Sequence, residues 1–352
     1  MRYTTIQPAR LARIASFALV VAATLIASAA FAEAWPVSSS ASTEFNCFDQ
    51  DYFEPSGSTR QGDWLYVVSD NGLIGRQKQG DDQDCEHRSG SNHFDSQPLI
   101  TGSKEGDFES LAAVPGKTTL YLGVEGNAGT VPNAKIIEYQ PPADRLTQAN
   151  APSTLTGNSW TLTTLPVQDG DGMEAMTFVP DGEHPYTQAG APFNGLFYVA
   201  SQASKGTIYV FELGNSGSGD SGSVSQVATF TKPLLSASPS DLYFSPEDQR
   251  LYVLYDEGSH RLQVLKVLGG GYVQEAIYAP QFGTTKTNAQ MKGMEAVTTS
   301  AGGDLYIGLD QSRGQAADNG SCRETSDDHC TDWLNPIYRY ANFVPAPVLS
   351  TQ

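Results

Sequence analysis

Short runs of β-branched and aromatic residues recur along the chain and end at an acidic residue or, once, at glutamine. Five of these runs are alike: LYVVSD (65–70), LYLGVE (120–125), FYVASQ (197–202), LYVLYD (251–256) and LYIGLD (305–310). A second short run that contains an acid precedes each: FEPSG (53–57), FESLA (108–112), MEAMT (173–177), SDLYF (240–244) and MEAVT (294–298). A third run follows in most copies, for example KIIEYQ (135–140) and TIYVFEL (207–213). Runs of this length and composition predict β-strands.

The copies repeat with a period of about 55 residues, which is the period of a four-stranded propeller blade. We therefore predict an all-β protein with a single propeller domain over 33–352, interrupted by a Gly/Ser-rich insertion near 214–223. Five copies predict five blades, and six blades with one degenerate copy is the alternative. Because the last copy ends after its third strand at PIYRYANF, we expect WPVSSSASTEF (35–45) to supply the missing outer strand and close the ring.

The first 32 residues have the pattern of a secretory signal peptide. Arg2, Arg10 and Arg13 precede an apolar run over 14–30, and Ala30-Phe31-Ala32 is a small-residue cleavage site. A membrane anchor is the alternative, although the run is somewhat short for a span. We expect cleavage after Ala32, export to the periplasm or the extracellular space, no later membrane span, and a monomer.

Charge and cysteine content narrow the expected partners. The net charge of −18 becomes −21 when the three arginines of the leader are removed, and such acidity disfavours nucleic acid and anionic membranes as partners. The four cysteines would be oxidised in an exported protein. Cys322 and Cys330 flank one polar loop, so we pair them and pair Cys47 with Cys85 by elimination; three pairings are formally open.

Acids at the start of the first strand and at the end of the second would share one face of a propeller. This places two sets around one channel mouth: Glu54, Glu109, Glu174, Asp241 and Glu295 inside, and Asp70, Glu125, Gln202, Asp256 and Asp310 beside them, with Asp171 at the rim. Two carboxylates about 6 Å apart repel by about 3 kcal/mol at an effective dielectric constant of roughly 20. Oxygen ligands in such a ring suit Ca²⁺. The alternative is that these acids cap the backbone of neighbouring blades.

Basic residues follow the second strands in four copies, and we expect them on the same face. Arg76, Lys205, Arg261 and Arg313 could bind the oxyanion of a small-molecule or phosphorylated substrate next to acids that hold a cation. The alternative is that they are ordinary surface charges.

Two segments resemble the phytase-like esterase family, the SdiA-regulated propellers and the calcium-dependent β-propeller phytases: GDFESLAAVPGKTTLYLGVEG and KGMEAVTTSAGGDLYIGLDQ. In addition, EPSG before LYVVSDNG is similar to the first blade of these proteins. The resemblance implies calcium in the channel and, for true phytases, hydrolysis of a phosphomonoester. Glu109, Glu174 and Glu295 match the strand-start glutamates and are our candidate catalytic residues; Glu125 and Asp310 match the second-strand acids. The chain departs from the pattern at Ser110, Ala175 and Ala296, where the family has glycine, and at Asp241.

These patterns predict an exported, calcium-assisted hydrolase of a phosphomonoester or another ester. The alternative is a non-catalytic, calcium-stabilised propeller that binds a ligand or a surface partner.

Overall fold

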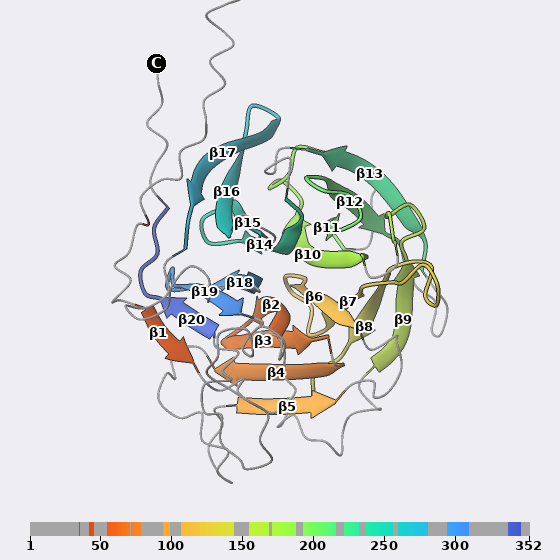
Figure 1. Ribbon diagram of the computed structural model, residues 1–352, viewed down its shortest axis with the longest axis horizontal. Coiled ribbons are helices and arrows are strands. Elements are labelled where there is room, and N and C mark those ends of the chain that lie inside the picture. Colours follow the sequence, from red (N-terminus) through yellow and green to blue (C-terminus); the bar gives the residue numbers. More distant parts are fainter. Residues whose placement is uncertain are drawn as a thin grey trace, which may run out of the picture.

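Twenty strands form five four-stranded antiparallel sheets arranged around a common axis, which is a five-bladed β-propeller (Figure 1). The computed structural model describes residues 35, 42–45, 55–70, 72–78, 94–98, 107–143, 155–168, 171–187, 193–215, 222–231, 237–255, 260–280, 294–309 and 337–345, with the backbone alone for 42–45 and 94–98. The predicted fold class and the count of five blades are confirmed, and the described residues do not form the alternative six-bladed ring.

Each of the first four blades is continuous in sequence and runs from the innermost to the outermost strand. The first blade holds β2 (Pro55–Gln61), β3 (Trp64–Ser69), β4 (Leu73–Lys78) and β5 (Phe94–Pro98). The second holds β6 (Phe108–Ala113), β7 (Leu120–Val124), β8 (Lys135–Tyr139) and β9 (Leu155–Thr161). The third holds β10 (Met173–Pro180), β11 (Gly195–Ser201), β12 (Ile208–Leu213) and β13 (Val224–Phe230). The fourth holds β14 (Pro239–Ser245), β15 (Arg250–Tyr255), β16 (Arg261–Leu268) and β17 (Gly271–Tyr278).

The fifth blade combines the two ends of the domain. Its inner strands are β18 (Met294–Thr299), β19 (Leu305–Leu309) and β20 (Ile337–Tyr340), and its outermost strand is β1 (Ser42–Phe45). Ser42 pairs with Tyr340 and Phe45 with Ile337 in an antiparallel ladder (Figure 1). The expected closure of the ring by an amino-terminal strand is therefore confirmed.

Burial along the strands follows their distance from the axis. All residues of β11 and β14 are buried, because an inner strand is covered by a neighbouring blade on each face. The outermost strands β9 and β13 include exposed residues on their outer surface. This explains why the inner strands are continuous apolar runs in the sequence instead of alternating ones.

Several predictions from the sequence lie outside the described residues. They are the leader at 1–32, the four cysteines with their proposed pairings, and residues 216–221 of the Gly/Ser-rich insertion, which lies between β12 and β13. In the parts of the chain that the structure describes, no helix is long and apolar enough to cross a membrane.

Candidate functional site

Every blade has a β-bulge at the same point of its innermost strand. The register shifts between Pro55 and Gly57, Phe108 and Ser110, Met173 and Ala175, Pro239 and Asp241, and Met294 and Ala296. The residues left at the bulges are Ser56, Glu109, Glu174, Ser240 and Glu295. A bulge changes the direction of a side chain and commonly occurs near functional sites. We call the end of the ring where these bulges lie the acidic end.

The observed bulges show that two of the acids predicted for the inner ring do not occupy the bulge position. Glu109, Glu174 and Glu295 occupy equivalent positions, as the sequence predicted, but Ser56 and Ser240 take these positions in the first and fourth blades. Asp241 is one residue too late in its strand, and Glu54 lies outside the described residues. The ring of bulge residues therefore contains three glutamates and two serines.

Asp241 has a structural role. Its carboxyl group is fully buried and accepts hydrogen bonds from the backbone N–H groups of Leu242 at 2.8 Å, Val297 at 2.6 Å and Ser58 at 3.4 Å. These donors belong to the fourth, fifth and first blades, so one side chain joins three blades. This is the capping role that the sequence analysis held as the alternative for the inner acids.

The second strands bring their final residues back to the acidic end. The residue directly after the last paired residue of the second strand is Asp70 after β3, Glu125 after β7 and Gln202 after β11. The last paired residues themselves lie opposite the bulges, where their partners are Pro55, Phe108 and Met173 in the same order. Asp256 and Asp310 lie outside the described residues.

Glu109 lies among other carboxyl groups. Burial is the main cause that raises the pKa of its carboxyl group well above the usual value of 4.5, although the residue keeps partial exposure. The charges of Glu174, Asp107, Asp70 and Glu295 raise that pKa further, in decreasing order. Because these acids come from four blades, the acidic end gathers carboxyl groups from most of the ring.

Glu174, on the neighbouring blade, is almost completely buried. Burial is again the main cause that raises the pKa of its carboxyl group, and the charges of Glu125, Asp107 and Asp171 add to the effect. A hydrogen bond with Gln202 acts in the opposite direction and favours the ionised form. Gln202 thus stands where the other blades have an acid after the second strand, and its side chain forms a hydrogen bond with Glu174.

Glu125 and Asp107 form a pair of carboxyl groups at the edge between the second and third blades. Burial raises the pKa of Glu125 to about 7, with help from the charge of Asp107 and a hydrogen bond to it. The N–H of Gly172 donates to Glu125 Oε1 at 3.1 Å and opposes the rise. Sequence reasoning missed Asp107, although it directly precedes the strand that carries Glu109.

The acidic segment DGDGMEAM (169–176) leads into β10, and its described part is tightly folded. Asp171 forms an isolated bridge with Gln168. A Cβ atom added to Gly172 would stand 2.2 Å from the carbonyl oxygen of Glu125, so the second blade leaves no room for a side chain there. Asp169 and Gly170 lie outside the described residues.

The predicted basic residues do not all lie at the acidic end. Arg76 is buried within β4, where its guanidinium group stacks 4.5 Å from the ring of Trp64 and donates to the Pro142 carbonyl oxygen at 3.2 Å. Trp64 begins β3 at the opposite end, so the expected place of Arg76 beside the acids is wrong: it holds the first blade against the second. Arg313 lies outside the described residues.

Lys205 and Arg261 do lie at the acidic end. Lys205 is exposed in the turn between β11 and β12, and Arg261 is the first residue of β16, opposite Tyr255. Arg261 Nη1 donates to the carbonyl oxygen of His260 at 3.1 Å. Both are therefore placed where they could meet an anionic group bound near the acids.

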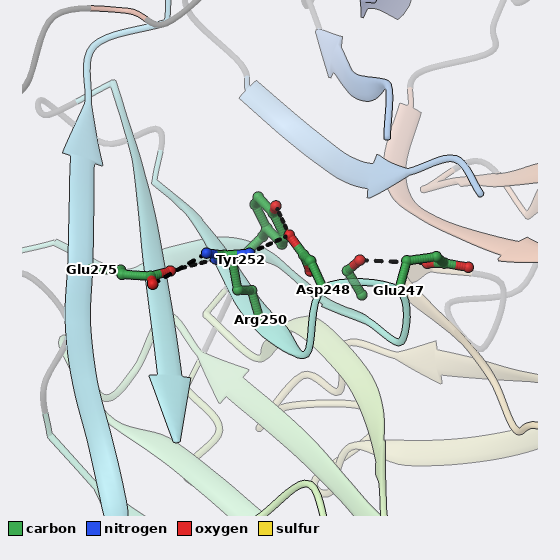
Figure 2. A network of polar contacts seen from close by, with 6 residues as sticks. Glu247, Asp248, Arg250, Tyr252 and Glu275 are labelled. Carbon is green, nitrogen blue, oxygen red and sulfur yellow. Dashed lines mark hydrogen bonds and ion pairs between the residues drawn. The ribbon is translucent and has the colours of Figure 1, made fainter. Parts of the chain in front are cut away.

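The opposite end of the ring, the far end, shows how this protein neutralises acids elsewhere. Arg250 contacts both Glu275 and Asp248, and the hydroxyl group of Tyr252 donates to Asp248 Oδ2 at 2.7 Å (Figure 2). Further ion pairs there join Arg60 to Glu247 and Arg339 to Asp304. In contrast, the strongest influences on the pKa of Glu109 all raise it, and none comes from a basic group.

The donor chemistry of the acidic end fits a hard cation, since the described acids there offer carboxyl oxygens. Within the described ranges, however, no three Asp, Glu, His or Cys side chains stand close enough to form a metal site by themselves. The expected ligands Glu54, Asp256 and Asp310 lie outside those ranges. Burial and neighbouring carboxyl groups raise the pKa of Glu109 and of Glu174 well above the usual value, so a bound cation would favour their ionised forms.

Comparison with known proteins gives no family. No protein-family model and no curated protein sequence matches the chain. Solved structures with some likeness include a putative 6-phosphogluconolactonase from Bacteroides uniformis (15% identity, 73% of this chain and 65% of that one, TM-score 0.33), the mitotic checkpoint complex (11%, 82% and 63%, 0.35) and Kuenenia stuttgartiensis hydrazine synthase (12%, 75% and 58%, 0.35). The chain spans less than two thirds of the length of each, and likenesses of this strength carry no information on function.

Proposed function

We propose that the acidic end binds calcium and that the protein is an exported hydrolase of a phosphomonoester or another ester, with its site at that end. The observation that carries the proposal is the pair Glu109 and Glu174. They stand at equivalent bulges of adjacent blades, and burial and neighbouring carboxyl groups raise the pKa of both. An arrangement that keeps these groups ionised near neutral pH needs a counterion.

Glu109, Glu174 and Glu295 would hold the cation from the bulges, with Asp70, Asp107, Glu125 and Asp171 beside them. When bound, calcium would neutralise charge on an oxyanion. The chain's own residues would do the rest. Gln202 holds Glu174 by a hydrogen bond, and Lys205 and Arg261 offer positive charge to the substrate from the same end.

Glu125 is suited to proton transfer. Without a bound cation its carboxyl group has a pKa of about 7, so in that state it can both donate and accept a proton near neutral pH. The Gly172 N–H donates to one of its oxygens at 3.1 Å, and the carboxyl group also shares a hydrogen bond with Asp107. We therefore assign Glu125 as the general acid or base of the proposed reaction.

The second candidate function is a non-catalytic propeller that calcium stabilises and that binds a ligand or surface partner. It is favoured by Asp241, an inner-strand acid that only joins blades. The export leader at 1–32, the monomeric state and the disulfides Cys47–Cys85 and Cys322–Cys330 are part of both proposals.

The test combines thermal unfolding with turnover. Unfolding is followed with excess calcium and with EGTA, and hydrolysis is measured on aryl phosphates and aryl acetates. The matched control for Glu174→Gln is Asp63→Asn, which removes one negative charge from an exposed turn at the far end. We expect calcium to raise the melting temperature of the wild type and of Asp63→Asn, and Glu174→Gln to lose both this response and turnover.

A calcium-dependent melting temperature without turnover on any substrate would favour the non-catalytic function. If neither the melting temperature nor turnover responds to calcium, the cation proposal is wrong in both forms.

A further inference from the structure

Gln202 is the one neutral residue at a position where the sequence otherwise has an acid. In the other four copies the second strand is followed by aspartate or glutamate, as at Asp70 and Glu125. Gln202 directly follows Ser201, the last residue of β11. A ring that only gathered charge for a cation would have an acid here as well, so the amide points to a different task.

The backbone of Gln202 is held on both sides of its side chain. Its N–H donates to the carbonyl oxygen of Gly172 at 3.0 Å, in the segment that leads into β10. Its carbonyl oxygen accepts a hydrogen bond from Ser238 Oγ at 3.3 Å, directly before β14 of the fourth blade. The preceding residue is held too, since Ser201 Oγ donates to the Pro166 carbonyl oxygen at 2.7 Å. Contacts from two blades therefore fix the point from which the Gln202 side chain extends.

That side chain reaches Glu174. The amide of Gln202 donates a hydrogen bond to the Glu174 carboxyl group, which is almost completely buried at the bulge of β10. The other groups that act most strongly on this carboxyl group are acids: Glu125, Asp107 and Asp171. Among these neighbours, Gln202 is the one that attracts the carboxylate instead of repelling it.

The backbone contacts also connect Gln202 to Glu125. Gly172 accepts the hydrogen bond from Gln202 and donates its own N–H to Glu125 Oε1 at 3.1 Å. A series of hydrogen bonds therefore runs from the fourth blade through Gln202 and Gly172 to Glu125 in the second blade. The Gln202 side chain branches from this series to Glu174, so a single residue connects the two glutamates.

We propose that Gln202 is the positioning residue of the acidic end: its amide holds the Glu174 carboxylate in the single orientation in which it would contribute to cation binding, while its backbone keeps Glu125 in register with it. This inference rests on the proposed function, because it takes a cation at this end as given. It explains the amide in the third copy. A carboxylate at position 202 would repel Glu174 and, when ionised, could not donate to it.

Calorimetric titration with calcium tests this role. Gln202→Ala should bind calcium about tenfold more weakly than the wild type, which is the effect expected for the loss of one hydrogen bond to a charged group. Gln202→Asn keeps an amide but is one methylene shorter, so it should lose as much affinity. The matched control is Gln249→Ala at the far end, which removes an amide that donates to Glu183 Oε1 at 2.8 Å. Its calcium affinity should stay within about twofold of the wild type.

A change of background shows whether Gln202 acts through Glu174. In Glu174→Asp the shorter carboxylate is out of reach of the amide, so adding Gln202→Ala should change calcium affinity by less than about twofold. In Glu109→Asp, whose altered acid is not a partner of Gln202, adding Gln202→Ala should still cost about tenfold.

Thermal unfolding in EGTA tests the same contact without calcium. Gln202→Ala should lower the melting temperature by about 2 °C in the wild type, and by less than about 0.5 °C when Glu174 is already replaced by alanine. Equal shifts in the two backgrounds would overturn the positioning role.

The calcium titrations can overturn it in three further ways: wild-type affinity in Gln202→Ala, full affinity in Gln202→Asn, or an undiminished effect of Gln202→Ala in the Glu174→Asp background. A wild type that binds no calcium would instead overturn the proposed function. The melting temperatures in EGTA would then decide alone whether Gln202 holds Glu174.

Discussion

Replacing Glu125 by glutamine should stabilise the calcium-free protein at alkaline pH and leave it almost unchanged at pH 4. The glutamine Oε1 can still accept the hydrogen bond from the Gly172 N–H, and its amide can donate to Asp107. The substitution therefore removes the titration of this carboxyl group while it keeps the local contacts.

The sign follows from proton binding in the two states. In the unfolded chain Glu125 loses its proton near pH 4.5, whereas in the folded protein burial and Asp107 hold the pKa at about 7. Between these values the folded state binds more protons at Glu125, so the contribution of this residue to stability falls as pH rises from about 4.5 to about 7 and then stays level. The glutamine variant lacks this loss.

The magnitude follows from the same pKa. A rise from 4.5 to about 7 corresponds to at most about 3.4 kcal/mol, at 1.36 kcal/mol for each pKa unit. Solvent at the edge of the ring screens part of this interaction, so we expect a gain of about 1–2 kcal/mol at pH 8.5. At pH 4 the gain should be only a few tenths of a kcal/mol.

Urea unfolding at pH 4, 6 and 8.5 in the presence of EGTA measures the difference, with Asp63→Asn in the exposed far-end turn as the control. A difference between Glu125→Gln and the wild type that is the same at pH 4 and pH 8.5 would refute the reasoning. With excess calcium at pH 8.5 the sign should reverse, because the variant then lacks one negative charge next to the cation. If only that reversal fails, the result contradicts calcium binding near Glu125 but still supports the raised pKa that burial and Asp107 cause.

Two further predictions concern the contacts between blades. Asp241→Asn should lower the free energy of unfolding by about 2–4 kcal/mol in urea, because an amide cannot accept all three backbone hydrogen bonds; a loss below about 0.5 kcal/mol would contradict the structural role. Gly172→Ala should lower the free energy of unfolding by about 1–3 kcal/mol, measured by thermal unfolding, because the added Cβ atom would meet the Glu125 backbone. Gly271→Ala is the control and should be nearly neutral, since a Cβ atom there would have nothing within 4 Å. Equal effects of the two substitutions would contradict this reasoning.

The sequence predicted the fold well because the evidence for it is local. Each inner strand is buried on both faces and therefore reads as a short apolar run, and five similar runs predict five blades. The acid at the end of a second strand was also placed well, since Asp70 and Glu125 follow the last pair of a regular ladder. Closure by an amino-terminal strand followed from the missing fourth strand of the last copy.

The inner ring was less predictable because a bulge adds a residue without a sequence signal. In the fourth blade, Ser240 and Asp241 are adjacent, and the acid looked like the equivalent of Glu109 although the register gives that position to the serine. Arg76 was misplaced for a related reason: it follows Asp70 closely, but β4 has already carried it toward the far end. Such errors of one to six residues decide which side chains meet.

The corrected register makes the acidic end asymmetric. The serines at the bulges of the first and fourth blades remove two of the five expected charges, whereas Asp107, Glu125 and Asp171 add charge between the second and third blades. A cation would therefore be attracted to the side of Glu109 and Glu174 and away from the centre of the ring. Lys205 extends from the third blade at the same end, so an anionic substrate would find its positive charge on that side too. Serine carries no charge to remove, so the comparison adds one instead: Ser240→Glu would place a carboxyl group at the bulge of the fourth blade, and calcium affinity should respond to it less than to the loss of Glu174.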